Sequence, residues 1–201
     1  MNETVEGPRA RYRRQVRDEV QARAWEQIGR DGVAALSLKA IATQMGMTAP
    51  ALYRYYSSRD ELLTELILSG YRDLAESVEV AVDGELPPAA RLSEMALALR
   101  GWAVAEPQRY LLLYGTPVPG YHAPQTATDL AARIFAPILA AYRQVSDSGD
   151  RTATAFHRSM TFWTRLHGVL SLELAGHFAG MDVDADQLFR DEVHSLVTAT
   201  G

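Results

Sequence analysis

Acidic residues and a histidine near the C-terminus have the residue types that bind metal ions. Glu173 and His177 are four residues apart, which would place two possible ligands on one face of a helix. A polar pair in or beside the core also explains this spacing, and we favour that interpretation. Asp182, Asp184 and Asp186 match the start of a calcium-binding loop, but its sixth and twelfth positions lack the required Gly and Glu. The sequence therefore predicts no metal site.

Catalytic motifs are missing as well. The sequence contains no Gly-x-Ser-x-Gly elbow, no phosphate-binding glycine loop and no dinucleotide-binding fingerprint. We therefore expect neither enzyme activity nor a cofactor.

The composition limits the class of protein. With 201 residues, 47% of them hydrophobic, the chain can form one domain or two small ones around a packed core. The lack of cysteine excludes disulfides and cysteine-bound metals. No secretory segment opens the chain, and its most apolar run, residues 168–178, is too short to span a membrane. We expect a cytoplasmic protein without membrane contact.

Positive charge is concentrated at the N-terminus. Residues 1–60 carry a net charge of +3 and residues 61–201 one of −8, so the chain total of −5 conceals a basic end. Four arginines cluster between Arg9 and Arg14. Such a cluster can contact DNA phosphates or the minor groove, and the alternative is a solvated helix start. We expect residues 1–12 to form a disordered basic arm.

The elements that would position a DNA contact lie within residues 37–62. Ser37 can cap a first short helix, and Gly46 can end it because glycine tolerates the left-handed conformation. Thr48 can cap a second short helix with proline in its first turn, and a capping box then opens a long third helix. This succession is typical of a helix-turn-helix, whose second helix can enter a DNA major groove.

The helix-turn-helix also has particular residue types at fixed positions. These are Ile41, Ala42, Gly46, Thr48, Leu52, Tyr53, Tyr55, Tyr56 and the run from Arg59 to Leu62. Together they resemble the DNA-binding domain of the tetracycline-repressor (TetR) family. The alternative is an unrelated three-helix unit that contains a helix-turn-helix by chance.

The resemblance implies roles for individual residues. It implies that Thr48, Tyr53 and Arg59 contact phosphates, and a hydroxyl, a phenol and a cation can each hold a phosphate oxygen. It implies that residues 49–51 and Tyr55 face the bases, although the three small residues can offer only apolar contact, best suited to thymine methyl groups.

Lys39 and Arg54 are the nearest side chains that could donate two hydrogen bonds to guanine. The full set of expected DNA-binding residues is Ser37, Lys39, Thr48, Ala49, Pro50, Ala51, Tyr53, Arg54, Tyr55 and Arg59.

The rest of the chain shows helical periodicity and no strand-like alternation. Further helices are predicted up to about residue 82, around residues 92–102, and at 107–114, 125–145, 150–178 and 184–199. We predict an all-α fold of about nine helices. Residues 13–62 would form a three-helix DNA-binding domain, and residues 63–201 a bundle for effector binding and dimerisation.

Aromatic residues recur on several middle helices: Trp102, Tyr110, Tyr114, Phe135, Trp163 and His167. Core packing is the simpler interpretation for each one. As a set they favour an apolar ligand cavity with a few polar anchors, which TetR-like proteins usually carry. We expect His167 to be the polar anchor for a small-molecule effector. The segment from Trp163 to Phe178 also resembles the C-terminal domain of a TetR subgroup named for Trp, His and Gly.

The last two helices are apolar on more than one face, which predicts burial on several sides. We expect them to pack against a second copy of the chain as a four-helix bundle, and a core within one chain is the alternative. The expected interface residues are Leu166, Leu170, Leu174, Leu188, Val193 and Leu196.

These features predict a homodimeric transcriptional regulator. We expect a repressor that binds a palindromic double-stranded operator and is released from it by a small molecule. The alternative is a helical enzyme or ligand-binding protein that keeps this fold without binding an operator.

Overall fold

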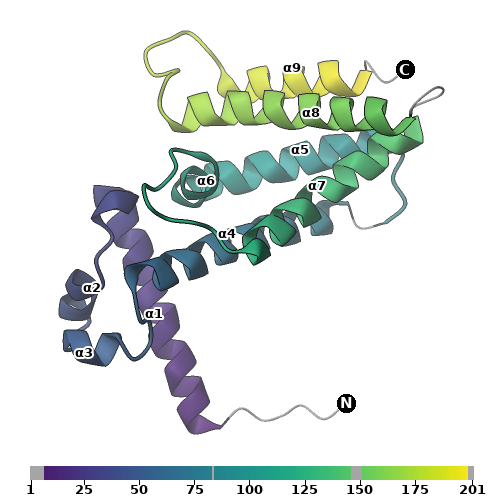
Figure 1. Ribbon diagram of the computed structural model, residues 1–201. Coiled ribbons are helices and arrows are strands. Elements are labelled where there is room, and N and C mark those ends of the chain that lie inside the picture. Colours follow the sequence, from purple (N-terminus) through teal and green to yellow (C-terminus); the bar gives the residue numbers. More distant parts are fainter. Residues whose placement is uncertain (1–6, 83, 146–150, 199–201) are drawn as a thin grey trace. The chain divides into compact units, whose positions relative to one another are not determined.

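The computed structural model describes residues 7–82, 84–145 and 151–198 (Figure 1). The secondary structure of these residues is entirely helical, which confirms the predicted all-α fold. The elements are α1 (Pro8–Asp31), the 3-10 turn η1 (Val33–Ala35), α2 (Leu38–Gln44), α3 (Ala49–Leu52), α4 (Arg59–Ala81), α5 (Pro88–Ala105), α6 (Pro107–Tyr114), α7 (Gln125–Val145), α8 (Arg151–Leu174) and α9 (Ala185–Thr198). Over the described ranges, no helix is long and apolar enough to cross a membrane.

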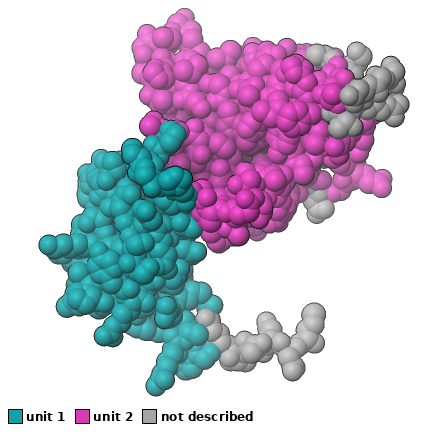
Figure 2. Space-filling view, in the orientation of Figure 1, with its two compact units in different colours: residues 1–67, 117–122 teal, residues 68–116, 123–201 magenta. Residues whose placement is uncertain are grey.

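The helices form two compact units (Figure 2). The first comprises residues 1–67 and 117–122, and the second residues 68–116 and 123–201. Helix α4 therefore begins in the first unit and ends in the second. The connection between α6 and α7 contributes residues to the first unit, where Tyr121 Oη lies 3.0 Å from Thr64 Oγ1.

Helix α1 supports the first unit with a stripe of buried residues at four-residue spacing: Val16, Val20, Ala24 and Ile28. The helix begins at Pro8, inside the segment predicted to be a disordered arm, because Gly7 caps it and proline suits the first helical turn. Residues 8–12 are therefore helical, and the prediction of a disordered arm does not hold for them. Residues 1–6 lie outside the described residues.

The second unit is a helical bundle with a large apolar core. Its core includes fully buried side chains from α4, α5, α6, α8 and α9, among them Leu74, Leu92, Tyr110, Phe162 and Phe189. Helix α8 lies beside both α7 and α9 (Figure 1). This bundle holds every aromatic residue that the sequence assigned to an effector site.

Helix α8 ends at Leu174, four residues earlier than predicted. The chain leaves the helix at Gly176, whose φ is +79°, and the N–H of His177 donates back to the carbonyl of Leu172 at 2.9 Å. Glu173 and His177 therefore do not share a helical face, and the two-ligand metal pair considered from the sequence does not form.

Candidate DNA interface and effector site

The turn between α2 and α3 is built by the caps that the sequence predicts. Ser37 Oγ and Thr48 Oγ1 each accept a hydrogen bond of 3.4 Å from the backbone N–H three residues later. Between these helices Gly46 has a φ of +64°, which other residues rarely adopt. The N–H of Ser37 also donates to Gln27 Oε1 at 2.8 Å, which attaches the start of α2 to α1. Ser37 therefore serves as a helix cap.

The outer face of α3 and of the turn after it is open to solvent. Leu52 and Tyr56 are fully buried and attach this segment to the core of the first unit. The residues predicted to contact DNA are either exposed (Lys39, Thr48, Pro50, Tyr53 and Arg54) or half-buried (Ala49, Ala51 and Tyr55). This surface offers a hydroxyl, two phenols and two cations around small apolar residues. It therefore has groups for both phosphate and base contacts.

Two arginines of α1 hold the chain that follows α3. Arg17 Nη1 donates to the carbonyl oxygen of Tyr55 at 2.9 Å, and Arg13 Nη2 donates to that of Arg54 at 3.4 Å. Carbonyls at the end of a helix lack intrahelical donors, and cations bind them favourably. Arg17 Nη2 also lies 3.3 Å from Glu65 Oε2 on α4. The role of Arg17 could not be predicted from the sequence, because the only signal for it is its spacing of four residues from Arg13.

Arg59 is turned toward the protein. Its Nη2 donates to the carbonyl oxygen of Val33 at 2.8 Å, and its Nε donates to that of Leu36 at 3.2 Å. The side chain is half-buried, and these two bonds hold η1 and the start of α2 against the first turn of α4. Arg59 therefore supports the helix-turn-helix, and the phosphate contact expected from the sequence stays a prediction.

Five of the six residues expected at the effector site come together in the second unit. The ring centroid of His167 lies 4.1 Å from that of Trp163, 4.4 Å from that of Tyr114 and 5.5 Å from that of Tyr110. The ring of Phe135 is 6.2 Å from Trp163. These side chains come from α6, α7 and α8.

Tyr71 on α4 completes the group, with its ring centroid 6.1 Å from that of Tyr114. We call Tyr71, Tyr110, Tyr114, Phe135, Trp163 and His167 the aromatic cluster. Trp102 is buried in the core of the second unit, and no ring contact among the described residues joins it to the cluster.

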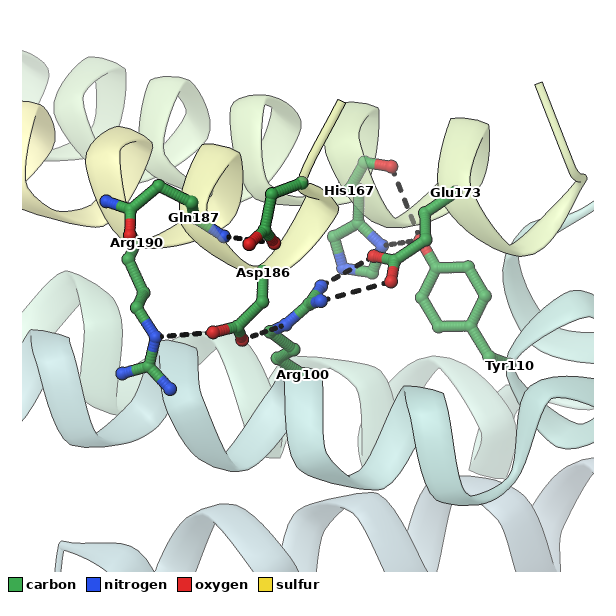
Figure 3. A network of polar contacts seen from close by, with 8 residues as sticks. Arg100, Tyr110, His167, Glu173, Asp186, Gln187 and Arg190 are labelled. Carbon is green, nitrogen blue, oxygen red and sulfur yellow. Dashed lines mark hydrogen bonds and ion pairs between the residues drawn. The ribbon is translucent and has the colours of Figure 1, made fainter. Parts of the chain in front are cut away.

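Hydrogen bonds within the aromatic cluster leave two buried polar atoms unpaired. Tyr110 Oη lies 2.9 Å from His167 Nδ1 and 3.1 Å from Ser171 Oγ (Figure 3 shows the contact with His167). His167 Nε2 and Tyr114 Oη are buried without a partner within the described structure. Burial lowers the pKa of His167 to about 4 and raises that of Tyr114 above its ordinary range, so both groups are neutral near pH 7.

The aromatic cluster is closely packed. Trp163 also lines a cavity of about 10 Å³, whose other walls are apolar side chains of α4, α5, α7 and α8. A space of this size holds at most one water molecule, and an apolar lining disfavours even that. A ligand that enters the cluster must therefore displace side chains. Trp163 is the cluster residue that we expect to move, because it also lines the cavity.

Glu173 belongs to an ion-pair network that runs from a buried arginine to the surface (Figure 3). Arg100 on α5, only 8% exposed, donates to both carboxylate oxygens of Glu173 at 2.5 and 3.0 Å and to Asp186 Oδ1 at 3.0 Å. Arg190 donates to the second oxygen of Asp186 at 2.7 Å. The network joins α5 to the end of α8 and the start of α9. Glu173 and Asp186, two of the carboxylates that the sequence suggested as metal ligands, therefore bind arginines.

Four of the six residues expected at a dimer interface lie inside a single chain. Leu166 and Leu170 are fully buried, and Val193 and Leu196 are 6% and 7% exposed. These four side chains face the core of their own bundle and leave little surface for contact with a second chain, so their place in a dimer interface stays a prediction. Helical periodicity shows that a face is buried but not which partner buries it. Leu174 and Leu188 are half-buried.

A different face of α8 is open to solvent. Met160, Thr164, Gly168 and Leu172 are exposed at four-residue spacing, so they form one stripe along the helix. A Cβ atom added at Gly168 would meet no atom within 4 Å. This stripe of small and apolar residues is therefore free for contact with another molecule.

The all-helical fold and the exposed helix-turn-helix define a DNA-binding regulator with a separate helical C-terminal unit. Residues 22–66 match the family of bacterial regulatory proteins called the tetR family, and residues 92–196 match the tetracyclin repressor-like C-terminal domain. The chain belongs to the TetR family of transcriptional regulators. The subgroup named for Trp, His and Gly stays a prediction.

Individual proteins agree with this assignment. The HTH-type transcriptional regulator Rv1816 of Mycobacterium tuberculosis is 35% identical, with 92% of this chain and 94% of that protein covered. The crystal structure of the regulatory protein SCO4313 shares 47% identity and a TM-score of 0.86, covering 96% of this chain and all of that one. A single-substitution variant of TetR from Acinetobacter baumannii, in complex with minocycline, shares the fold, with 16% identity, a TM-score of 0.62, and 90% and 93% of the two chains covered.

Proposed function

We propose that this regulator is a homodimeric repressor that binds a palindromic operator and leaves it when a small molecule binds. One observation carries the DNA-binding part of the proposal. The residues of α3 and its flanks that could reach a groove are exposed or half-buried, while Leu52, Tyr56 and Arg17 attach this segment to the rest of the unit. Such a surface can approach DNA without losing its own packing.

The contacts to DNA divide by chemistry. Thr48 and Tyr53 supply groups that can bind phosphate oxygens and add affinity without reading sequence, while the guanidinium of Arg54 can bind either a phosphate or a base. Residues 49–51 are small enough for close approach to the major groove and would contact thymine methyl groups. Lys39 and Arg54 are the exposed side chains that could donate to guanine.

The aromatic cluster supports a small-molecule effector. It combines apolar rings from four helices with two buried, unpaired polar atoms, the composition of a ligand site. The complex of a structural neighbour with minocycline shows that this fold can hold a small molecule elsewhere in the family. A ligand would weaken operator binding only if it bound more tightly to the arrangement of helices that does not fit the operator.

We assign dimerisation to the exposed stripe of α8 at residues 160, 164, 168 and 172. The occupant that fits is a second copy of the chain, because two identical helix-turn-helix units bind two half-sites about one DNA turn apart. The small residues at 164 and 168 allow close helix approach, and the apolar ends at 160 and 172 supply buried area. We place the regulator in the cytoplasm and propose no enzyme activity for it.

Selection of genomic fragments by the purified protein tests the function. The operator recovered should contain an inverted repeat, and its binding should weaken steeply as salt rises, because bound phosphates release counterions. A protein that recovers no sequence above background and binds DNA without salt dependence would be a ligand-binding protein or enzyme on this fold.

A further inference from the structure

The unpaired atoms of the aromatic cluster point to the chemistry of its ligand. His167 Nε2 and Tyr114 Oη are both buried without a partner, and their rings lie 4.4 Å apart. Buried polar groups are nearly always hydrogen-bonded in native proteins, and leaving one unpaired is costly. Two such atoms on neighbouring rings therefore mark a position for a polar atom of a bound molecule.

The hydrogen bonds of Tyr110 indicate whether His167 Nε2 is a hydrogen-bond donor or an acceptor toward that molecule. A phenol has one proton, and the contact of Tyr110 Oη with His167 Nδ1 (2.9 Å) is shorter than its contact with the carbonyl oxygen of residue 167 (3.4 Å). We therefore assign the phenol proton to the bond with Nδ1, and the hydroxyl of Ser171 as donor to Tyr110. In this tautomer Nε2 carries the proton of the neutral ring and is a hydrogen-bond donor.

The cluster offers no charge to an ionic ligand. Burial keeps His167 neutral, because its pKa is lowered to about 4, and it keeps the phenol of Tyr114 protonated. The three cation–ring contacts of the described structure involve Tyr55, Tyr56 and Phe189, none of which belongs to the cluster. A carboxylate or ammonium that entered this site would lose its hydration without gaining an opposite charge.

The aromatic rings around the two unpaired atoms favour a ligand with a flat shape. Rings of Phe135, Trp163 and Tyr114 meet edge to face, at angles of 73° to 86° and centroid distances of 5.9 to 6.2 Å. A flat, apolar framework can stack on these rings, and a shift of Trp163 would join its space to the apolar cavity beside it.

We propose that the aromatic cluster binds an uncharged, flat, mainly apolar molecule whose carbonyl oxygen accepts hydrogen bonds from His167 Nε2–H and Tyr114 O–H. A carbonyl oxygen has two lone pairs, so one atom can accept from both donors. This proposal rests on the proposed effector site and adds the chemical class of the effector.

Three probes with one framework test the proposal on the full chain. They are 2-acetylnaphthalene, which has a neutral carbonyl, 2-ethylnaphthalene, which has no acceptor, and the anion 2-naphthoate. Isothermal titration calorimetry gives their affinities. We expect 2-acetylnaphthalene to bind about tenfold more tightly than 2-ethylnaphthalene, the effect of two modest hydrogen bonds, and 2-naphthoate to bind most weakly.

Variants locate the two hydrogen bonds. His167→Phe and Tyr114→Phe should each reduce the preference for the carbonyl probe about threefold, while the affinity for 2-ethylnaphthalene stays nearly constant. Tyr71→Phe is the matched control, because it removes a phenol from the same cluster that is not one of the unpaired atoms, and it should keep the full preference. If His167→Phe fails to fold, Tyr114→Phe alone decides.

Several outcomes would overturn the proposal. These are tightest binding of 2-naphthoate, equal affinity of the ethyl and acetyl probes, an unchanged preference in both variants, and no binding of any probe, as when a water molecule pairs the two atoms. Operator binding is measured separately by gel shift. If the carbonyl probe binds as expected but the operator stays bound, the ligand class stands and the effector function fails. If 2-naphthoate releases the operator instead, the effector function stands and the ligand class fails.

Discussion

The guanidinium of Arg17 donates a 2.9 Å hydrogen bond to the carbonyl oxygen of Tyr55, immediately after α3. The same guanidinium lies 4.3 Å from the ring centroid of Tyr56 and is paired with Glu65. Arg17 of α1 thus contacts both the residues that follow α3 and helix α4. It sets where the exposed face of α3 points.

Arg17→Ala should therefore lower both stability and operator affinity while leaving the salt dependence of DNA binding nearly unchanged. A hydrogen bond from a charged group to a partly buried carbonyl contributes about 1.5–3 kcal/mol. Urea unfolding and gel shifts at several salt concentrations measure the two effects. Arg23→Ala is the control on the same helix, because its pair with Glu26 is exposed and contributes less than about 1 kcal/mol. A loss of salt dependence with unchanged stability would instead make Arg17 a phosphate contact.

Arg59→Ala should destabilise the first unit by about 1–3 kcal/mol, since two backbone carbonyls lose their donors. Arg59→Lys should not restore stability, because an ammonium cannot reproduce the two-pronged geometry of a guanidinium. Arg54→Ala gives the contrasting result. Its side chain is exposed, so stability should stay constant while the salt slope of DNA binding falls by roughly one unit. The interpretation of Arg59 fails if its variant shows the Arg54 behaviour.

Thr48 and Arg59 differ in how far away along the chain their hydrogen-bond partners lie, and this distance decides whether the sequence can predict their roles. The capping role of Thr48 depends only on the three residues that follow it, so the pattern alone identified it. The partners of Arg59 are carbonyls more than twenty residues away, and no local pattern reveals them. The same holds for Glu173. Its partner Arg100 is 73 residues away, so the sequence pattern could suggest a metal ligand but could not show the ion pair.

The aromatic cluster and the interface differ in a similar way. Helical periodicity predicted the helices that carry the aromatic residues, and five of the six residues expected at the effector site lie together in the aromatic cluster. Trp102 shares their residue type and periodicity, but no ring contact among the described residues joins it to the cluster. For α8, which is apolar on more than one face, periodicity could not tell Leu166, which packs inside the bundle, from Leu172, which faces solvent.

Ala49→Glu should nearly abolish operator binding without unfolding the protein. Ala49 is the first residue of α3, where an acidic side chain suits the positive end of a helix, so the fold tolerates it. A carboxylate at this position would repel phosphates and block close approach of α3 to the groove. Ala22→Glu adds the same charge on the exposed face of α1 and is the control. Operator affinity equal to that of the unaltered protein would show that α3 does not enter the groove.

The buried neutral imidazole of His167 should make stability depend on pH. Its pKa is about 4 in the folded protein and about 6.5 in an unfolded chain, so only the unfolded state binds a proton between these values. The free energy of unfolding should therefore be highest above pH 6.5 and fall by on the order of 3 kcal/mol as pH drops to 4.

His167→Phe should remove that part of the pH dependence, as measured by urea unfolding at half-unit pH steps. Equal profiles for His167→Phe and the unaltered protein would show that the imidazole is hydrated in the folded state.

The exposed stripe on α8 leads to the last prediction, on the dimer. Leu172 is 46% exposed in one chain, so Leu172→Glu should leave the fold of each chain intact. In the dimer it would bury an unpaired charge, which costs several kcal/mol and weakens association about thirtyfold or more.

Sedimentation velocity should therefore show a folded monomer, and operator affinity should fall because one half-site is lost. Leu166→Glu should instead unfold the bundle, because that side chain has no exposed surface. Val80→Glu, at an exposed apolar residue of α4, should remain a dimer. If Leu172→Glu also sediments as a dimer with full operator affinity, the two chains meet on a different face.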